Sequence, residues 1–419
     1  MDSSQSNHAL VLGASGLIGW SVVNQLLSNY PMPGSFPRVT ALTNRPVGLE
    51  ESCWPTERLS TGRPSLRLVS GVDLRCDGLG DSGNGPQELA KTLLERVEDA
   101  HTFTHVYYFV FTSLQDHLEE VAVNKRMLEN VIGALEILGA PLKFVVFPGG
   151  TRGYGIYTPG GTFTPPLAED MVNNLPPDYA KTVVYPVFRE LLTKACQGKS
   201  WTWCEICPDA IIGFTPNGSQ FSLALHWAQY LSLYAHNHGL RPQQTERPAA
   251  PVTIPFPGNE AAYESKFTPV SAKTLACFAI HASMDPNNCG GGRLFNIGDS
   301  VKPAKFREIW PRLAAWFGME GTSPVASSAD DASNDDKKVM PGQYIAQHQD
   351  VFLGKGLHRA VKAGVGAGSS QLDSVGTWLT FDRQLSLKKL RDSGFNEEKD
   401  PVDGWLESFE AFRKAGLIF

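Results

Sequence analysis

The sequence predicts a doubly wound α/β protein built on a parallel β-sheet, and three observations lead to this prediction. A short apolar run at 9–12 breaks into glycines at positions 13, 16 and 19, and an apolar helical segment follows from residue 20. Strand-like and helix-like segments then alternate over the first 215 residues, which is typical of right-handed βαβ units. The chain has 419 residues, of which 42% are hydrophobic and 19% charged, so it can bury a substantial core.

Five strands are expected in the first part of the chain, each followed by a helix or a turn. Helices are expected at 20–27, 86–99 and 114–138. The longest of them has one apolar stripe at helical spacing, formed by Leu118, Val121, Leu128, Val131, Leu135 and Leu138. The expected strands are 9–12, 38–43, 66–74, 105–111 and 142–147.

The second part of the chain predicts a long ordered loop and then further alternation. Residues 151–178 are rich in Gly, Pro and Thr, and a loop of this length is usually functional or disordered. A late strand at 292–299 resembles an edge strand of the same sheet. A proline-rich connector is expected at 240–260 and a solvated charged loop at 330–338. The remaining expected elements are a strand at 201–212 and helices at 185–195, 221–238, 305–317, 386–394 and 402–415.

Composition excludes several classes of function. The net charge of −6 gives no reason to expect nucleic acid or an anionic membrane as a partner. No run reaches the ~18 apolar residues of a membrane span, and the polar N-terminus lacks the basic segment of a secretory signal, so we expect a cytoplasmic protein. Seven cysteines argue against a disulfide framework. Cys204 and Cys207 have C-x-x-C spacing, but on a strand their sulfurs would point to opposite faces, so no metal site is predicted.

The glycine motif has the layout of a dinucleotide-binding turn. Gly13 allows a tight turn from strand to helix, Gly16 lets backbone N–H groups approach a pyrophosphate, and Gly19 lets helix and strand pack closely. Because the motif stands between a strand and a helix, it predicts cofactor binding more strongly than a lone glycine triplet would.

The end of the second strand favours NADP(H) over NAD(H). NAD sites place an acidic residue there to bind the ribose 2′-hydroxyl, whereas an arginine accommodates the 2′-phosphate. This chain has Thr43, Asn44 and Arg45, with no carboxylate before Glu50. Asp73, at the end of the third strand, is a candidate for the adenine edge.

The candidate proton donors are tyrosines near a cation, because a tyrosine hydroxyl can stabilise an oxygen that gains negative charge as hydride arrives. Tyr154, Tyr157, Tyr179 and Tyr185 lie in or after the loop that also contains Arg152. Short-chain dehydrogenases usually have Tyr-x-x-x-Lys. Here Arg189 follows Tyr185 at that spacing, and Val183 follows Tyr179, so the usual motif is missing.

Several motifs resemble the progesterone 5β-reductase and iridoid synthase family. They are the glycine motif, Asn44-Arg45-Pro46, residues 104–108, Asn124, Leu142-Lys143, the segment 208–216 and Phe295-Asn296. Members of that family are extended short-chain dehydrogenases that reduce the C=C bond of activated enones with NADPH. The resemblance covers nearly the whole chain.

The resemblance implies two catalytic positions. The family tyrosine falls on Tyr185, with Pro186 where the family has a second tyrosine. The family lysine falls on Arg152, which keeps the positive charge but stays protonated and cannot relay a proton. The cofactor-binding positions implied by the motif and the resemblance are Gly13, Ser15, Gly16, Leu17, Ile18, Gly19, Asn44, Arg45, Asp73, Leu74, Val110, Phe111, Pro148, Tyr185 and Ile211.

These observations lead to one functional hypothesis and three alternatives. The leading hypothesis is an NADPH-dependent reductase of an enone in a hydrophobic metabolite, with Tyr185 stabilising the enolate. Reduction of a ketone or imine, isomerisation or cyclisation without net redox change, and nucleotide sensing without turnover remain open.

We expect a Rossmann domain at 1–215, completed by a late strand near 250–300, and a substrate-binding cap at 216–249 and 300–419. A homodimer is possible. The expected pocket walls are the 151–178 loop, Phe111, Trp227, Tyr230, Trp378 and Phe381.

Overall fold

The sheet of this protein is parallel throughout and has seven strands. The computed structural model describes residues 6–55, 63–76, 84–240, 250–325, 339–364 and 369–419. The strands lie in the order β10-β6-β5-β4-β1-β2-β3, and every neighbouring pair is parallel. They are β1 (His8–Leu12), β2 (Arg38–Thr43), β3 (Ser65–Ser70), β4 (His105–Tyr108), β5 (Phe144–Pro148), β6 (Thr202–Pro208) and β10 (Arg293–Ile297). The predicted fold class is confirmed, and the late strand β10 forms an edge of the sheet.

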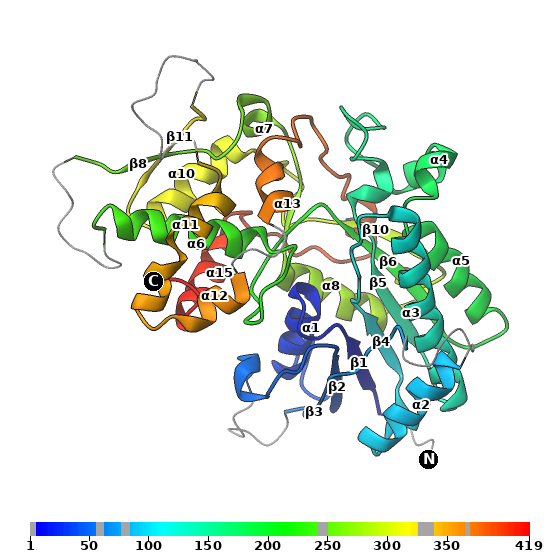
Figure 1. The fold of residues 1–419 in the computed structure, drawn as a ribbon. Helices are drawn as coiled ribbons and strands as arrows, with labels where there is room; N and C mark the ends of the chain where they lie inside the picture. Colours follow the sequence, from blue (N-terminus) through cyan, green and yellow to red (C-terminus); the bar gives the residue numbers. More distant parts are fainter. Residues whose placement is uncertain (1–5, 56–62, 77–83, 241–249, 326–338, 365–368) are drawn as a thin grey trace.

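Helices cover both faces of the sheet (Figure 1). One face packs against α1 (Leu17–Leu27) and α8 (Ala272–Met284), through strand residues such as Val11 and Val146. The other face packs against α2 (Gly85–Arg96), α3 (His117–Ile137) and α5 (Tyr185–Cys196). Because each central strand is buried on both faces, its sequence is a continuous apolar run rather than an alternating one.

A second hydrophobic core lies beside the sheet. It is built around α6 (Leu223–Asn237), α10 (Phe306–Trp316), α11 (Pro341–Gly354) and α15 (Asp403–Lys414). At its centre the rings of Trp227 and Trp405 are stacked, with centroids 5.2 Å apart. Trp227 and Tyr230 are each only 1% exposed, so the prediction that these two aromatics line a pocket is wrong.

Short elements complete the chain. Two further two-stranded parallel sheets pair β7 with β9 and β8 with β11. The remaining elements are β7 (Ala210–Ile212), β8 (Thr253–Pro255), β9 (Pro269–Ser271), β11 (Glu320–Thr322), α4 (Pro177–Ala180), α7 (Glu260–Glu264), α9 (Pro286–Cys289), α12 (His358–Gly364), α13 (Ser369–Asp373), α14 (Lys388–Asp392), and 3-10 turns at Glu50–Ser52, Ala100–Thr102, Thr151–Tyr154, Glu169–Asn174 and Ser374–Gly376.

Several predicted boundaries were wrong. The third and fourth strands end at Ser70 and Tyr108, so residues 71–74 and 109–111 belong to loops at the sheet edge. The predicted strand 201–212 divides at Asp209 into β6 and β7. Leu118 is 61% exposed, because it lies in the first turn of α3, beyond the part of that helix that packs on the sheet.

Further predictions concern two loops, the C-x-x-C pair and membrane spans. The charged run 330–338 and most of the first half of the 240–260 connector lie outside the described residues. Cys204 and Cys207 are both buried and free. Among the described residues, every helix is too short or too polar to span a bilayer.

Candidate active site

A groove with a volume of about 520 Å³ runs along the carboxyl ends of the central strands. Its floor comes from the loops after β1, β2, β4 and β5, and residues 218–221 form an outer wall. The order of strands reverses between β1 and β4, and ligands of doubly wound proteins bind at such a reversal. The predicted cofactor residues that line it are Gly13, Ser15, Gly16, Leu17, Ile18, Asn44, Arg45, Leu74, Val110, Phe111, Pro148 and Ile211.

The glycine-rich turn fits a pyrophosphate because its glycines leave the backbone accessible to a ligand and pack closely on neighbouring backbone atoms. Gly13 has a φ of +75°, and a Cβ there would lie 2.2 Å from the carbonyl oxygen of Phe109. A Cβ on Gly19 would lie 2.2 Å from the carbonyl oxygen of Gly13, so Gly19 has a packing role and does not line the groove. Gly16 is the N-cap of α1, whose first turn has no acidic side chain and no side-chain cap. The free N–H groups of this helix start can therefore bind an anion.

The groove lining includes one arginine, Arg45, that is accessible to a ligand. Arg45 is exposed, and its Nη1 donates a hydrogen bond to the carbonyl oxygen of Asn217 over 3.5 Å. Arg45 forms no ion pair with a carboxylate of the described residues. A guanidinium without a carboxylate partner is suited to bind a phosphate.

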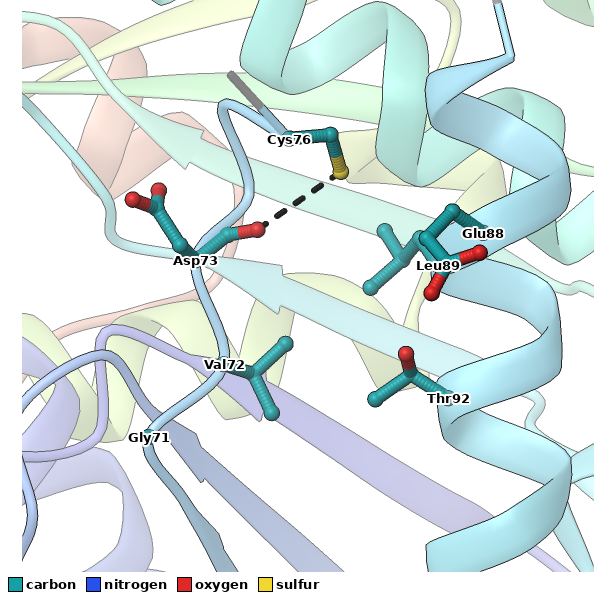
Figure 2. Close-up of a pocket in the computed structure, with 7 residues that line it drawn as sticks. All are labelled: Gly71, Val72, Asp73, Cys76, Glu88, Leu89 and Thr92. Carbon is teal, nitrogen blue, oxygen red and sulfur yellow. Dashed lines mark hydrogen bonds between the residues drawn. The ribbon is translucent and has the colours of Figure 1, made fainter. Parts of the chain in front are cut away.

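The Asp73 carboxylate pairs with a neighbouring arginine and does not line the groove. Its carboxylate forms an ion pair with Arg75, with Oδ2 and Nη2 2.5 Å apart, and hydrogen bonds from Arg75 lower the pKa of Asp73. It lines a separate pocket of about 280 Å³ with Cys76 and Glu88, where the Cys76 thiol donates to the Asp73 carbonyl oxygen (Figure 2). The structure therefore places Asp73 beside the predicted cofactor site and not in its lining.

The loop after β4 is held by Asn124 of α3. Its side-chain Oδ1 accepts a hydrogen bond from the backbone N–H of Thr112 over 2.9 Å, and its Nδ2 donates to the Thr112 carbonyl oxygen over 2.8 Å. Asn124 is fully buried. This amide therefore fixes the backbone next to Phe111, where the groove continues from the nucleotide side toward the centre of the sheet edge.

Tyr185 begins α5 just beyond the inner end of the groove. A Cβ on Gly150 would lie 2.8 Å from the Tyr185 hydroxyl, so only glycine fits between this ring and the chain that leaves Pro148. Within the described residues, the hydroxyl makes no hydrogen bond. Burial raises the pKa of Tyr185 well above its ordinary value, and the nearby positive charge of Arg152 opposes this shift only in part.

Arg152 contacts an acidic partner that the sequence analysis did not identify. Its Nη1 lies 2.5 Å from Oε1 of Glu120, a carboxylate whose side chain is only 2% exposed. Its Nη2 donates to the carbonyl oxygen of Thr182 over 2.8 Å, and its guanidinium lies over the ring of Tyr157, 5.3 Å from the centroid. Arg152 thus connects α3 to the segment that leads into Tyr185.

Arg189 is paired in the same way. Its Nε and Nη2 donate to the two carboxylate oxygens of Glu205 over 2.5 and 3.1 Å, and the side chain of Glu205 is 1% exposed. A Cβ on Gly149 would lie 2.1 Å from Oε1 of Glu205. Arg189, which stands at the usual position of the short-chain dehydrogenase lysine, is therefore engaged in a buried ion pair.

Two other candidate tyrosines have structural partners. Tyr154 is 1% exposed and donates to Oδ1 of Asn296 over 2.7 Å, which joins the loop to β10. Tyr179 donates to the carbonyl oxygen of Arg152 over 3.1 Å. Among the described residues, neither Tyr157 nor Tyr185 makes a hydrogen bond through its hydroxyl. Tyr157 is 41% exposed and lies under the Arg152 guanidinium, whereas the Tyr185 hydroxyl lies against Gly150, close to the groove, which favours Tyr185 as the donor.

Comparisons with known proteins agree with this architecture. The sequence pattern of the PRISE-like Rossmann-fold domain matches residues 9–419. The short chain dehydrogenase ausT of Aspergillus calidoustus is 30% identical, and the match covers 98% of this chain and 94% of that protein.

More distant relatives match over most of their length. A 3-oxo-Delta(4,5)-steroid 5-beta-reductase of Arabidopsis thaliana is 24% identical, with 97% and 92% covered. An (S)-8-oxocitronellyl enol synthase of Camptotheca acuminata is 24% identical, with 94% and 86% covered. Among solved structures, GDP-mannoheptose C4 reductase of Campylobacter jejuni has a TM-score of 0.56 at 13% identity, with 98% of this chain and 100% of that chain covered.

Proposed function

Because this chain belongs to the PRISE-like Rossmann-fold family and is an oxidoreductase of the short-chain dehydrogenase type, we propose that it reduces the C=C bond of an enone with NADPH. The resemblance to the progesterone 5β-reductase and iridoid synthase family is confirmed. The observation that carries the proposal is the Tyr185 hydroxyl, which has no hydrogen-bond partner among the described residues and lies against Gly150, two residues after Pro148 of the groove lining.

The residues of the groove fit a dinucleotide phosphate. The backbone around Gly13 and Gly16 would hold the pyrophosphate at the start of α1, and Arg45 would bind a 2′-phosphate on the adenosine ribose. The lining of the groove also includes two apolar rings, Phe111 and Phe221, whose centroids are 6.2 Å apart. These rings support a hydrophobic substrate.

Each residue at the inner end has a distinct task. When bound, the nicotinamide supplies a hydride, which an enone accepts at its β-carbon. The electrons of the C=C bond then move toward the carbonyl, and its oxygen becomes an enolate oxygen. Tyr185 donates a hydrogen bond to that oxygen and stabilises the charge that develops there. Arg152 holds the carbonyl of Thr182 and so fixes the start of the helix from which Tyr185 projects.

NADPH consumption with a panel of hydrophobic enones and their saturated ketones tests this function. We expect the near-ultraviolet absorbance of NADPH to fall with enones. Consumption with ketones alone would replace the proposal with carbonyl reduction. Product formation without consumption would replace it with isomerisation or cyclisation, and tight NADPH binding with no product at all would indicate a sensor.

Replacing Tyr185 by phenylalanine removes the hydroxyl and keeps the ring. We expect Tyr185→Phe to lower kcat for an enone by roughly 100-fold or more, since a positioned proton donor contributes about that factor, while the Kd for NADPH stays the same. Steady-state kinetics and calorimetry measure the two quantities. Tyr263→Phe, in the second core, is the matched control and keeps wild-type kcat. An unchanged kcat in Tyr185→Phe would assign the reaction to another donor.

A further inference from the structure

Arg152 acts on the candidate catalytic tyrosine and Arg189 lies one turn along the helix that the tyrosine begins, and each arginine has its own buried glutamate. Glu120 pairs with Arg152 and is 1% exposed as a residue, and Glu205, also 1% exposed, pairs with Arg189. Glu205 lies against Gly149 and the Tyr185 hydroxyl against Gly150, so this ion pair and the hydroxyl flank two consecutive glycines. Such pairing needs explanation, because burying a carboxylate is costly unless a cation and hydrogen bonds compensate it.

Both glutamates are held rigidly. Oε2 of Glu120 accepts a hydrogen bond from the backbone N–H of Leu114 over 3.0 Å, while Oε1 faces Arg152. Both oxygens of Glu205 receive N–H groups of Arg189. Burial raises the pKa of Glu205, and the two-pronged contact with the Arg189 guanidinium opposes that shift.

The groups that face Tyr185 are therefore balanced in charge. Arg152 comes from the turn after β5, and Tyr157 follows it in the same loop. Glu205 and Cys207 come from β6, and Arg189 lies one turn along α5. Glu120 reaches the cluster from α3 through Arg152. Burial raises the pKa of the Cys207 thiol well above its usual range, so it is uncharged. When both carboxylates are ionised, the charges of the two guanidinium groups and the two glutamates sum to zero.

An environment without net charge around Tyr185 affects enone reduction and ketone reduction differently. Hydride addition to a ketone carbon gives an alkoxide, a strong base that must take the proton from tyrosine, and the tyrosinate left behind needs a net positive charge nearby. Hydride addition to the β-carbon of an enone gives an enolate, which is a much weaker base. A hydrogen bond from a neutral tyrosine stabilises the enolate, and its α-carbon later takes a proton from water.

We propose that Glu120 and Glu205 make this site selective for conjugate reduction over carbonyl reduction, by cancelling the charges of Arg152 and Arg189 beside the Tyr185 hydroxyl. This inference rests on the proposed function and adds two positioning residues to it. It also accounts for the arginine at the family lysine position, because the planar guanidinium meets both Glu120 and the carbonyl of Thr182 at once.

Glu120→Gln is the informative variant, since it keeps the shape of the side chain and leaves Arg152 without a counter-charge. An ultraviolet pH titration of tyrosinate, taken as the difference between each protein and its Tyr185→Phe counterpart, measures ionisation of this one residue without turnover. We expect Tyr185 of the wild-type protein to stay protonated through its ordinary pKa of 10.0. In Glu120→Gln we expect its pKa to fall by at least about one unit, a tenfold change in equilibrium.

The kinetic counterpart is the ratio of kcat/KM for a saturated ketone to that for an enone. We expect this ratio to rise at least about tenfold in Glu120→Gln. The double variant Glu120→Gln/Arg152→Gln restores neutrality and is expected to return the titration to the wild-type form. Glu119→Gln, which removes the same charge from an exposed neighbour, changes neither quantity. Circular dichroism melting shows whether each variant is folded.

Two results would overturn the inference. One is ionisation of Tyr185 at or below its ordinary pKa in the wild-type protein. The other is an unchanged titration in a folded Glu120→Gln. Glu205→Gln tests the second pair in the same way. If the wild-type protein consumed no NADPH with any enone, the proposed function would fail, and the titration would still report whether the glutamates control the tyrosine.

Discussion

Single residues decide how closely the chain can approach itself at this site. Gly149 and Gly150 lie against Glu205 and the Tyr185 hydroxyl, and Gly13 lies against the carbonyl of Phe109. A methyl group at any of these three positions would meet an atom at 2.8 Å or less. The glycines therefore fix the distance between the nucleotide groove and the tyrosine, and alanine at each would displace one from the other.

We expect the choice between NADPH and NADH to depend on Arg45. We expect Arg45→Glu to weaken NADPH binding about 10- to 100-fold, because it removes a charge-assisted contact to the 2′-phosphate, while NADH binding changes little. Calorimetry with both nucleotides measures this difference. Arg307→Glu makes the same change of charge at an exposed position of α10 and leaves both affinities unaltered. Equal losses for NADPH and NADH would place Arg45 away from the phosphate.

Candidate residues could be named from the sequence where a local pattern or a family motif marks them. Tyr185 is named from the family resemblance, and the glycines and Arg45 stand in recognisable local patterns. The partners of the arginines do not, because Glu120 precedes Arg152 by 32 residues and Glu205 follows Arg189 by 16. A glutamate within an apolar strand, as at position 205, is the available signal, since a charged residue in a doubly buried strand needs a partner.

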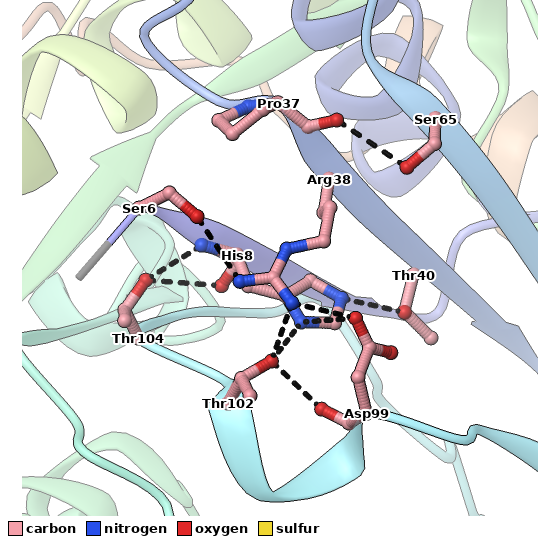
Figure 3. Close-up of polar contacts among 9 residues, drawn as sticks. All are labelled: Ser6, His8, Pro37, Arg38, Thr40, Ser65, Asp99, Thr102 and Thr104. Atoms are coloured by element: carbon pink, nitrogen blue, oxygen red, sulfur yellow. Dashed lines mark hydrogen bonds and ion pairs between the residues drawn. The ribbon is translucent and has the colours of Figure 1, made fainter.

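Among the elements, β1 begins with a buried histidine that is held by side chains of three other segments. At the amino end of β1, His8 is 2% exposed and shares hydrogen bonds with the hydroxyls of Thr102 and Thr40, each over 2.9 Å (Figure 3). Thr104 accepts its backbone N–H over 2.8 Å. Burial lowers the pKa of His8 to about 4, although the charge of Asp99 acts in the opposite direction.

This histidine makes stability depend on pH. Its folded-state pKa lies below the unfolded value of 6.5, so the unfolded chain takes up the proton first as the pH falls. The contribution is complete above pH 6.5 and is lost between 6.5 and about 4. The loss is at most ~3 kcal/mol. Urea unfolding of the wild type and of His8→Asn at both ends of this range measures it, and we expect a smaller loss in the variant. The exposed His117→Asn serves as control, and identical losses in all three proteins would contradict the assignment.

Element types were easier to predict than their ends. The helices and strands of the sheet were predicted from periodicity and apolar runs. The ends of the third and fourth strands were predicted too late, because apolar residues such as Val72 and Val110 continue past the last ladder hydrogen bond and line pockets there. Hydrophobicity reports burial, and these loop residues are buried or half-buried like those of a strand.

At the scale of the whole molecule, two cores share one chain. The sheet core was predicted as a sheet with helices on both faces. The second core was underestimated, because its aromatic residues come from distant segments. Trp227 and Trp405 are separated by 177 residues of chain, and no local pattern identifies them as a pair.

Trp405 tests how much the second core contributes. It is 0% exposed, so Trp405→Ala is expected to lower the free energy of unfolding by about 3–5 kcal/mol. Trp378→Ala, at a side chain that is 47% exposed, is expected to cost far less. Chemical denaturation of both variants provides the measurement. Equal losses would show that the second core is loosely packed around position 405.

The edge position of β10 has a consequence for biosynthesis. This strand pairs with β6 along its whole length, and Asn296 within it receives the hydroxyl of Tyr154 and donates to the carbonyls of Leu167 and Ser386. Synthesis must therefore pass two thirds of the polypeptide before the 151–178 loop meets this anchor. Until then β6 presents an open edge to other nascent chains, so a truncated product that stops before residue 293 should be recognised by chaperones and degraded rather than accumulate as a free nucleotide-binding fragment.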